Sequence, residues 1–190
     1  MADEPRKPRF SKTEASEKLI ASAVALMKDN PIGKVSALKI CAHAGLDKMT
    51  VRYCFGSFAG LLIATAVSLG RDISRHVHDG IFDDSAYTDE NSVLFGKLVA
   101  YLFTSLGDRL PAVDLEQLPN FMLLEKQIAE TYGFEPELAR ALAKRSSLIA
   151  VATVALEHFI PLTPRERILL NRAQRRFFTD IAKVQDIITE

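Results

Sequence analysis

The sequence contains no tryptophan, two cysteines and no excess of either charge. Cys41 and Cys54 do not form a Cys-x-x-Cys pair, so we predict neither a disulfide framework nor a cysteine metal site. Unpaired cysteines and an N-terminus without the apolar core of a secretory signal favour a cytoplasmic protein. The longest apolar run, 148–156, is about half the length that spans a bilayer, so we expect no membrane partner.

Motifs that would carry catalysis are also lacking. The sequence has no glycine-rich phosphate loop, no nucleophile elbow and no paired-carboxylate motif. The four histidines are His43, His76, His78 and His158. His76 and His78 stand two apart on a predicted helix and so point to different faces. We interpret these two as ordinary polar residues and His43 as a solvated side chain, and we predict no metal and no cofactor. We therefore expect no enzyme, although a helical pocket that holds catalytic groups without a local motif is the lesser alternative.

The charge is unevenly distributed along the 190 residues. Residues 1–57 hold ten basic and six acidic residues, a net charge of +4, which leaves fourteen basic and eighteen acidic residues, −4, in the remainder. A basic segment attracts phosphate, although chance asymmetry would give the same split. In the N-terminal arm, Arg6, Lys7 and Arg9 either contact DNA or form a solvated tail, and the tail is the favoured reading.

Apolar residues recur with a helical period throughout, and no segment has the pattern of a strand. We predict an all-α fold with two domains. Residues 1–57 form an arm and a three-helix head, and residues 58–190 form a helical-bundle body. The first helix starts at the capping box Ser11–Glu14, with Ile20, Val24 and Met27 as its inner stripe. The later long helices are expected over 58–79, 91–110, 115–132, 136–160 and 164–189.

The segment 36–55 has the pattern of two short helices joined at Gly45, where the chain must leave right-handed helical space. Ser36 and Asp47 are the expected caps of the two helices. The apolar face of the first comprises Leu38, Ile40, Cys41 and Ala44. The inward residues of the second are Val51, Cys54 and Phe55. This spacing is typical of a helix-turn-helix, and an ordinary helical hairpin fits it equally well.

The region Leu19–Leu62 resembles the DNA-binding domain of the tetracycline-repressor (TetR) family. The matching residues keep the register without a gap and are Ile20–Met27, Ser36, Ile40–Cys41, Ala44–Asp47, Thr50–Val51, Tyr53, Phe55, Ser57 and Leu61. The resemblance implies a DNA-binding transcriptional regulator that acts as a ligand-responsive repressor. The sequence departs from the family where Met49 replaces a small residue, Arg52 an aromatic, Cys54 a His or Tyr, and Phe58 a lysine that lies at the DNA backbone.

On this basis, the helix 47–55 is predicted to enter the major groove of double-stranded DNA. The residues assigned to base edges or nearby phosphates are Lys48, Met49, Thr50 and Arg52. The residues assigned to the DNA backbone, which set register without reading sequence, are Ser36, Lys39 and Tyr53.

The body is expected to form a homodimer and to hold a small-molecule effector, as the resemblance implies. The second half of the helix 136–160 is apolar nearly all round, and the last helix has an extended apolar face. The expected interface residues are Ile149, Ala152, Leu156, Phe177 and Ile181. The effector-pocket residues are Tyr101, Phe121 and Met122, and Arg109, Glu125 and Arg145 are either polar anchors or surface pairs. The rival hypothesis is a ligand- or partner-binding dimer without DNA affinity, which Phe58 and the zero net charge favour.

Overall fold

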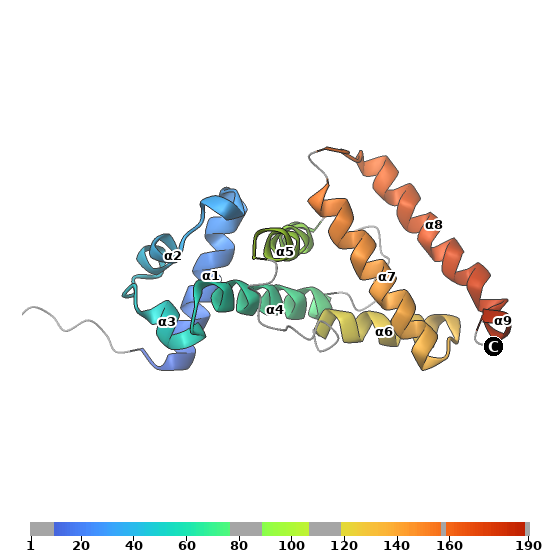
Figure 1. The fold of residues 1–190 in the computed structure, drawn as a ribbon, viewed down its shortest axis with the longest axis horizontal. Helices are drawn as coiled ribbons and strands as arrows, with labels where there is room; N and C mark the ends of the chain where they lie inside the picture. The colour runs from blue at the N-terminus through green and yellow to red at the C-terminus, as the bar shows by residue number, and fades with distance from the viewer. Residues whose placement is uncertain (1–9, 77–88, 107–118, 157–158, 189–190) are drawn as a thin grey trace, which may run out of the picture. The chain divides into compact units, whose positions relative to one another are not determined.

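The computed structural model describes residues 10–76, 89–106, 119–156 and 159–188, and every regular element in these ranges is helical (Figure 1). The predicted all-α class is confirmed. The chain divides into two compact units, Met1–Thr65 and Ala66–Glu190. The boundary between them falls inside helix α4 (Phe58–His76), whereas the sequence placed a domain boundary at the start of that helix.

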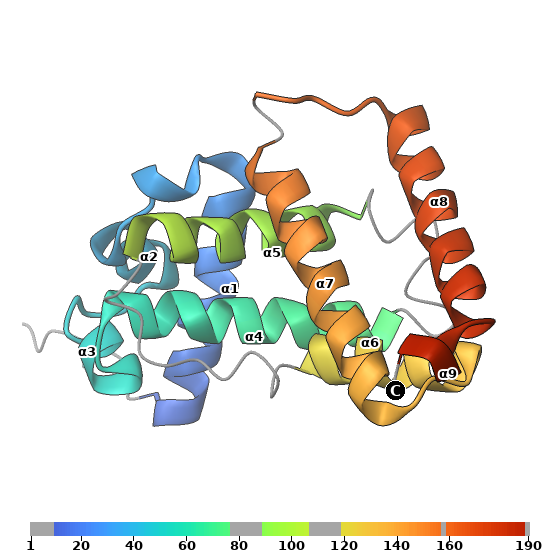
Figure 2. The same ribbon diagram turned by 45° about the vertical axis from the view of Figure 1, so that its right-hand side comes forward.

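The first unit contains α1 (Lys12–Asp29), the 3₁₀ turn η1 (Ile32–Lys34), α2 (Ala37–Ala44), α3 (Thr50–Phe55) and the start of α4. Helices α2 and α3 both contact α1 and lie on the same side of it (Figure 2). Helix α1 begins at the predicted capping box. The Ser11 hydroxyl accepts the Glu14 N–H at 3.2 Å, and the Glu14 carboxylate accepts the Ser11 N–H at 2.8 Å. The hydrogen bond from the Ser11 N–H to the Glu14 carboxylate, followed by one from the Ser11 side chain, lowers the pKa of Glu14.

The core of this unit uses a slightly different stripe of α1 from the one predicted. Its buried apolar residues follow four-residue spacing and are Ala15, Leu19, Ala23 and Met27. Ile20 and Val24, which were expected there, are half-buried. The small side chains of Ala15 and Ala23 lie in the core, whereas the larger Ile20 and Val24 lie at its edge. Size alone therefore favoured the wrong residues, because helices approach each other most closely where side chains are small.

The second unit contains α5 (Glu90–Tyr101), the π-helical segment η3 (Leu102–Leu106), α6 (Pro119–Tyr132), α7 (Pro136–Ala155), α8 (Pro164–Ala182) and α9 (Gln185–Ile188). Helix α7 packs against both α5 and α6. At its contact with α5 a Cβ added to Gly96 would lie 2.9 Å from Val154 Cγ2, so any larger residue at position 96 would force Val154 to move.

Helices α6, α7 and α8 share one hydrophobic cluster. Its buried members are Phe121, Leu124, Ile128, Phe134, Ala139, Leu142, Ala143 and Phe178. Phe178 is fully buried and brings α8 to the cluster, where its ring centroid lies 5.4 Å from that of Tyr132. Helix α8 runs in the opposite direction to α7 (Figures 1 and 2), and Gln174 of α8 donates a hydrogen bond to the Ser146 hydroxyl of α7 at 2.8 Å.

Several predicted helices end earlier than expected. The helix predicted over 91–110 continues as a π-helical segment after Tyr101, and the one predicted over 136–160 ends at Ala155. The last helix is interrupted after Ala182, where Lys183 and Val184 donate to carbonyls three residues back. Such bonds tighten the final turn and end an α-helix without the glycine or proline that would reveal the end in the sequence.

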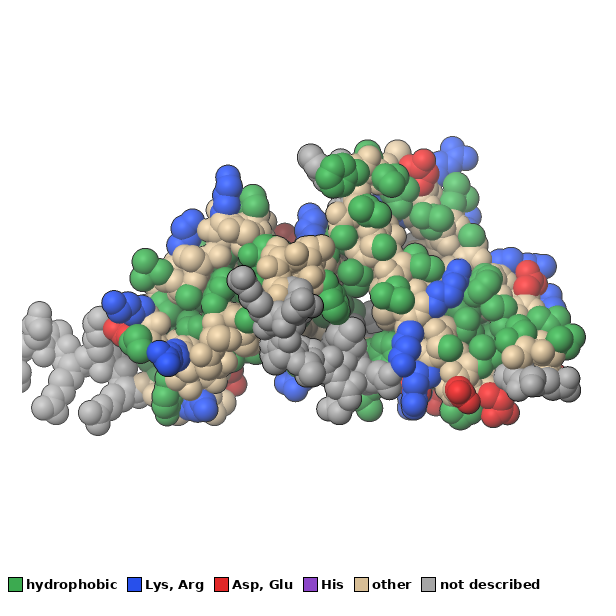
Figure 3. Space-filling view, viewed as in Figure 1, with side chains coloured by type: hydrophobic (Ala, Val, Ile, Leu, Met, Phe, Trp, Pro, Cys, Tyr) green, Lys and Arg blue, Asp and Glu red, His purple; other side chains and the backbone are tan. Residues whose placement is uncertain are grey.

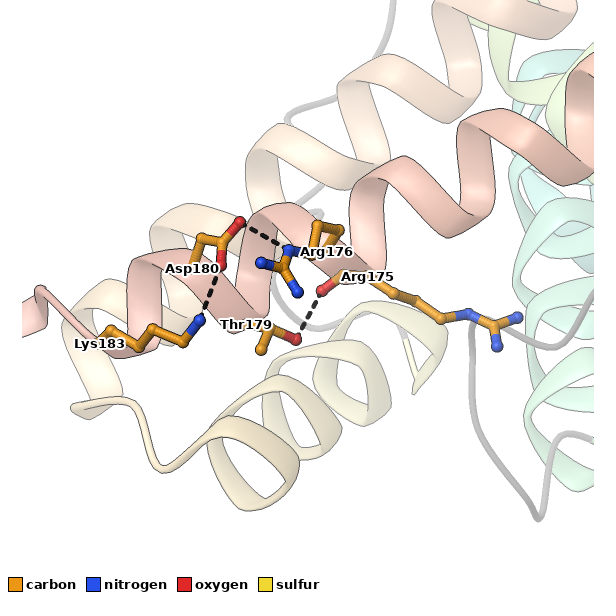
Figure 4. Close-up of polar contacts among 5 residues, drawn as sticks. All are labelled: Arg175, Arg176, Thr179, Asp180 and Lys183. Carbon is orange, nitrogen blue, oxygen red and sulfur yellow. Dashed lines mark hydrogen bonds and ion pairs between the residues drawn. The ribbon is translucent and has the colours of Figure 1, made fainter.

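The surface near this interruption is polar. Asp180 accepts hydrogen bonds from Arg176 Nε and Lys183 Nζ, each at 3.0 Å, and Thr179 donates to the Arg175 carbonyl at 3.0 Å (Figure 4). The bond from Lys183, followed by the charge of Arg176, lowers the pKa of Asp180. This part of α8 is a solvated face.

Candidate nucleic-acid interface

The hinge predicted at Gly45 is present. The Ser36 hydroxyl accepts the Lys39 N–H at 3.3 Å and so caps α2, as expected. At the other end of α2, Gly45 has φ 68° and ψ 28°, and the Leu46 N–H donates to the Cys41 carbonyl at 2.9 Å. A left-handed residue that closes a helix in this way is most readily glycine. The residues of the turn itself therefore determine how the two short helices are joined.

The second helix of the motif starts later than predicted. Helix α3 begins at Thr50, and Met49 occupies the capping position without a side-chain bond. Asp47 instead closes the preceding turn, because its Oδ1 accepts the Met49 N–H at 2.7 Å and its carbonyl accepts the Thr50 N–H at 2.9 Å. The expectation that Asp47 directly caps a helix over 47–55 is wrong, but its carboxylate fixes the backbone just before α3.

Helix α3 has a buried face and an exposed face. Val51 is 4% exposed, and Cys54 and Phe55 are half-buried, as the periodicity predicted. On the other face, Met49 is 56% and Tyr53 68% exposed. The remaining residues assigned to DNA are exposed, except Thr50, which is half-buried: Ser36, Lys39, Lys48 and Arg52.

Basic side chains lie beside Tyr53 and elsewhere on the motif. Lys12 Nζ lies 5.5 Å from the centroid of the Tyr53 ring, and Lys39 Nζ donates to the Lys34 carbonyl at 2.9 Å. Where Figure 3 shows α2 and α3, Lys and Arg side chains alternate with hydrophobic ones on the surface. The arrangement offers positive charge and apolar contact area on one side of the motif.

Leu38 lies outside the core, so its assignment to the apolar face of α2 is wrong. Its side chain is 65% exposed, whereas Ile40 and Cys41 are buried and Ala44 is half-buried. At about 100° per residue, Leu38 points about 110° away from the mean direction of the other three. This angle was available in the sequence and identifies Leu38 as a surface residue that the site prediction missed.

The two cysteines belong to the packing of the head. Cys41 is 1% exposed, and burial raises the pKa of its thiol, which therefore stays protonated. Cys54 is half-buried, and its Sγ lies 3.9 Å from the Lys12 carbonyl. Both act as small apolar side chains where the helices of the motif meet.

The fold has a solved counterpart. The TetR-family repressor AlkX from Dietzia sp. strain DQ12-45-1b, implicated in biodegradation of n-alkanes, superposes with a TM-score of 0.59 over 93% of this chain and 100% of that one, at 17% identity. The chain has a TetR-like fold. A TetR-family transcriptional regulator from Haemophilus influenzae RD gives a TM-score of 0.44 at 17% identity, over 90% and 97% of the two chains. No protein-family model and no curated protein matches the sequence.

In the TetR-like body, the predicted pocket residues point in different directions. Phe121 enters the core cluster, Met122 is 58% exposed, and Tyr101 is half-buried at the end of α5. Of the polar anchors, Glu125 pairs with Arg140 at 3.2 Å, Arg145 lies 4.2 Å from the Phe177 ring centroid, and Arg109 lies outside the described residues. The pocket assignment stays a prediction.

The end of α7 and the start of α8 carry an apolar face that is exposed in the single chain. It comprises Leu148, Ile149, Ala152, Leu156, Leu169 and Leu170, and we call it the α7–α8 face. Three of the five predicted interface residues belong to it. Phe177 and Ile181 do not, because both are half-buried against the core cluster of their own chain. Both lie on the extended apolar face expected of the last helix, and the direction in which that face packs is not evident from its sequence.

Two other kinds of site were sought in the described part of the chain. None of its helices is both long and apolar enough to span a bilayer. Within the same ranges, no three His, Cys, Asp or Glu side chains come together in a way that could hold a metal ion. The N-terminal residues Arg6, Lys7 and Arg9 lie outside these ranges.

Replacing Gly45 by alanine is expected to lower the free energy of unfolding by about 1–2 kcal/mol, because the left-handed backbone is strained for a residue with a Cβ. No atom lies within 4 Å of the added Cβ, so the loss is conformational. Gly45→Asn should lose less, since asparagine tolerates this conformation. Urea unfolding measures both. Gly33→Ala, at a glycine without positive φ, is the matched control, and an equal loss there would contradict the assignment.

Proposed function

We propose that this chain is a TetR-family transcriptional regulator that represses by binding a palindromic operator as a dimer and releases it in response to a small effector. The observation that carries the proposal is the outer face of α3, where Met49, Arg52 and Tyr53 are exposed behind a left-handed glycine turn. A helix held in this way fits the major groove. The excess positive charge of residues 1–57 favours phosphate at the same end.

Each predicted contact has a role that suits its position. Lys48 lies in the turn before α3 and Arg52 on its outer face, where charged side chains reach base edges or nearby phosphates. Tyr53 and Lys39 contact the backbone and set register. Ser36 acts only as an acceptor in its helix cap, so its hydroxyl can donate to a phosphate oxygen. Thr50, which is half-buried, contributes the least contact area.

Dimerisation through the α7–α8 face supplies the second head. Apolar side chains such as Leu148, which is 70% exposed, are unfavourable in water and mark an interaction surface when they cluster. Two heads on a palindrome double both readout and phosphate contacts, with half-sites about 34–36 Å apart. The interface then joins two α7–α8 pairs in a four-helix arrangement.

Effector control acts through α4, which belongs to both compact units. An effector bound near Tyr101, Phe121 and Met122 in the body shifts α4 and changes the spacing of the two heads. Because the half-site spacing is fixed, a small change removes one head from its site. Linkage then requires DNA to weaken effector binding by the same factor.

Selection of genomic fragments that bind the purified protein, followed by fluorescence anisotropy at several salt concentrations, tests the function. We expect a selected fragment to bind specifically, with an affinity that falls steeply as salt rises because bound counterions are released. A dimer that binds no fragment at any salt concentration would overturn the regulator and favour the rival, a partner-binding dimer in which Phe58 replaces a DNA-contacting lysine.

A further inference from the structure

Three large apolar side chains in the first unit remain exposed, and all three lie on the two helices of the DNA-binding motif or in the turn between them. They are Leu38 at 65%, Met49 at 56% and Tyr53 at 68%. Every other large apolar side chain within residues 10–65 is buried or half-buried. The exposure of these three side chains does not stabilise the fold. Because all three lie in one motif, we infer that they contact a binding partner.

Each of the three has a basic neighbour in the sequence. Lys39 follows Leu38, Lys48 precedes Met49, and Arg52 precedes Tyr53. Lysine is depleted at the centre of protein–protein interfaces, so an apolar patch interleaved with it suits a protein partner poorly. It suits DNA, because the basic groups meet phosphates while the apolar groups reach base edges.

Only one apolar group projects from the base edges into the major groove, the 5-methyl of thymine. Met49 is well suited to reach it. Its thioether donates no hydrogen bond, its side chain is long and adaptable, and Asp47 anchors its backbone N–H at 2.7 Å at the start of α3. Leu38, in the first turn of α2, offers a second apolar contact that is shorter and stiffer.

We propose that Met49 and Leu38 recognise thymine methyl groups in each operator half-site, so that part of the sequence specificity is read through apolar contact. This inference rests on the proposed function and names the side chains and the base groups through which the regulator would recognise its operator. Tyr53 is left to the backbone, with its ring beside Lys12. Met49, which departs from the small residue usual at its position, then becomes a specificity determinant of this chain.

A deoxyuridine scan of the selected operator tests the proposal. Deoxyuridine keeps every hydrogen-bonding group of thymine and lacks only the methyl, so any loss of affinity reports that methyl. We expect at least one thymine in each half-site whose replacement weakens binding about fourfold, the worth of burying one methyl-sized group, and about fifteenfold when both half-sites are changed. Anisotropy titrations at fixed salt measure these ratios.

The variants Met49→Ala and Leu38→Ala assign the contacts. Each variant should no longer distinguish thymine from uracil at the operator position that the replaced side chain contacts. It should still distinguish them at the position that the other side chain contacts. Both side chains are exposed, so the fold should persist, and thermal unfolding checks this. Lys48→Ala, the matched control, should weaken binding to both operators by the same factor.

The methyl contacts would be contradicted if no deoxyuridine replacement weakened binding, or if both alanine variants still distinguished thymine from uracil. Neither result would contradict the proposed regulatory function. If no fragment binds specifically at any salt concentration, the proposed function fails and this inference fails with it. A loss that follows Met49 alone would support its role and overturn that of Leu38.

Discussion

Arg52→Ala is expected to weaken binding to the selected operator on the order of 10²- to 10³-fold and to weaken non-specific binding far less. Arg52 is exposed on the outer face of α3, and a bidentate arginine–base contact is worth about 1–3 kcal/mol of discrimination. A dimer loses two such contacts, one in each head, so the effect on specific binding is doubled in free energy. Anisotropy titrations with the operator and with a scrambled duplex of equal length measure the two losses.

Arg52→Lys is the matched control for this result. Lysine keeps the positive charge but lacks the planar fork that pairs with two acceptors of one base. We therefore expect the lysine variant to retain non-specific affinity and to lose most of the preference for the operator. Equal losses on both duplexes in the alanine variant would instead show that Arg52 contacts phosphate only.

The local signals in the sequence predicted the framework of the site well. Ser11 and Ser36 each cap the helix they were assigned, and Gly45 adopts the left-handed conformation expected of it. These features depend on side chains that bond to backbone groups within about three residues, so they can be predicted without knowledge of the tertiary structure. The exposure of Met49 and Arg52 followed from the same local periodicity.

The differences from the structure share another cause. Leu38 was assigned to the wrong face of α2 from its hydrophobicity, while Phe177 and Ile181, whose place in the dimer interface stays a prediction, pack against their own chain. The face that a helix buries depends on which neighbours it packs against. A change of one position turns a side chain by about 100°, which separates the buried Phe121 from the exposed Met122 in the predicted pocket. Apolar character therefore predicted that these residues make contacts, but not with which part of the protein.

Phe177 and Ile181 pack against their own chain, so the dimer prediction is best tested at the α7–α8 face, where apolar side chains are exposed at the end of α7 and the start of α8. Ala152 lies in the middle of its α7 part, between Ile149 and Leu156. Ala152→Asp places a charge there in both subunits, since a twofold interface repeats each residue. We expect the dimer dissociation constant to rise by more than about 100-fold, from a cost of several kcal/mol for burying two unpaired carboxylates.

Sedimentation at micromolar concentration should then show the 21.1 kDa of one chain, with the unmodified protein at twice that mass. The matched control is Ala21→Asp, the same substitution at an exposed position within α1. It carries a similar helix-propensity cost, so a dimer in the control excludes an effect of aspartate on helix stability alone. The Ala152 variant should also lose operator affinity, because its heads bind half-sites one at a time. A dimer that persists in this variant would place the interface elsewhere.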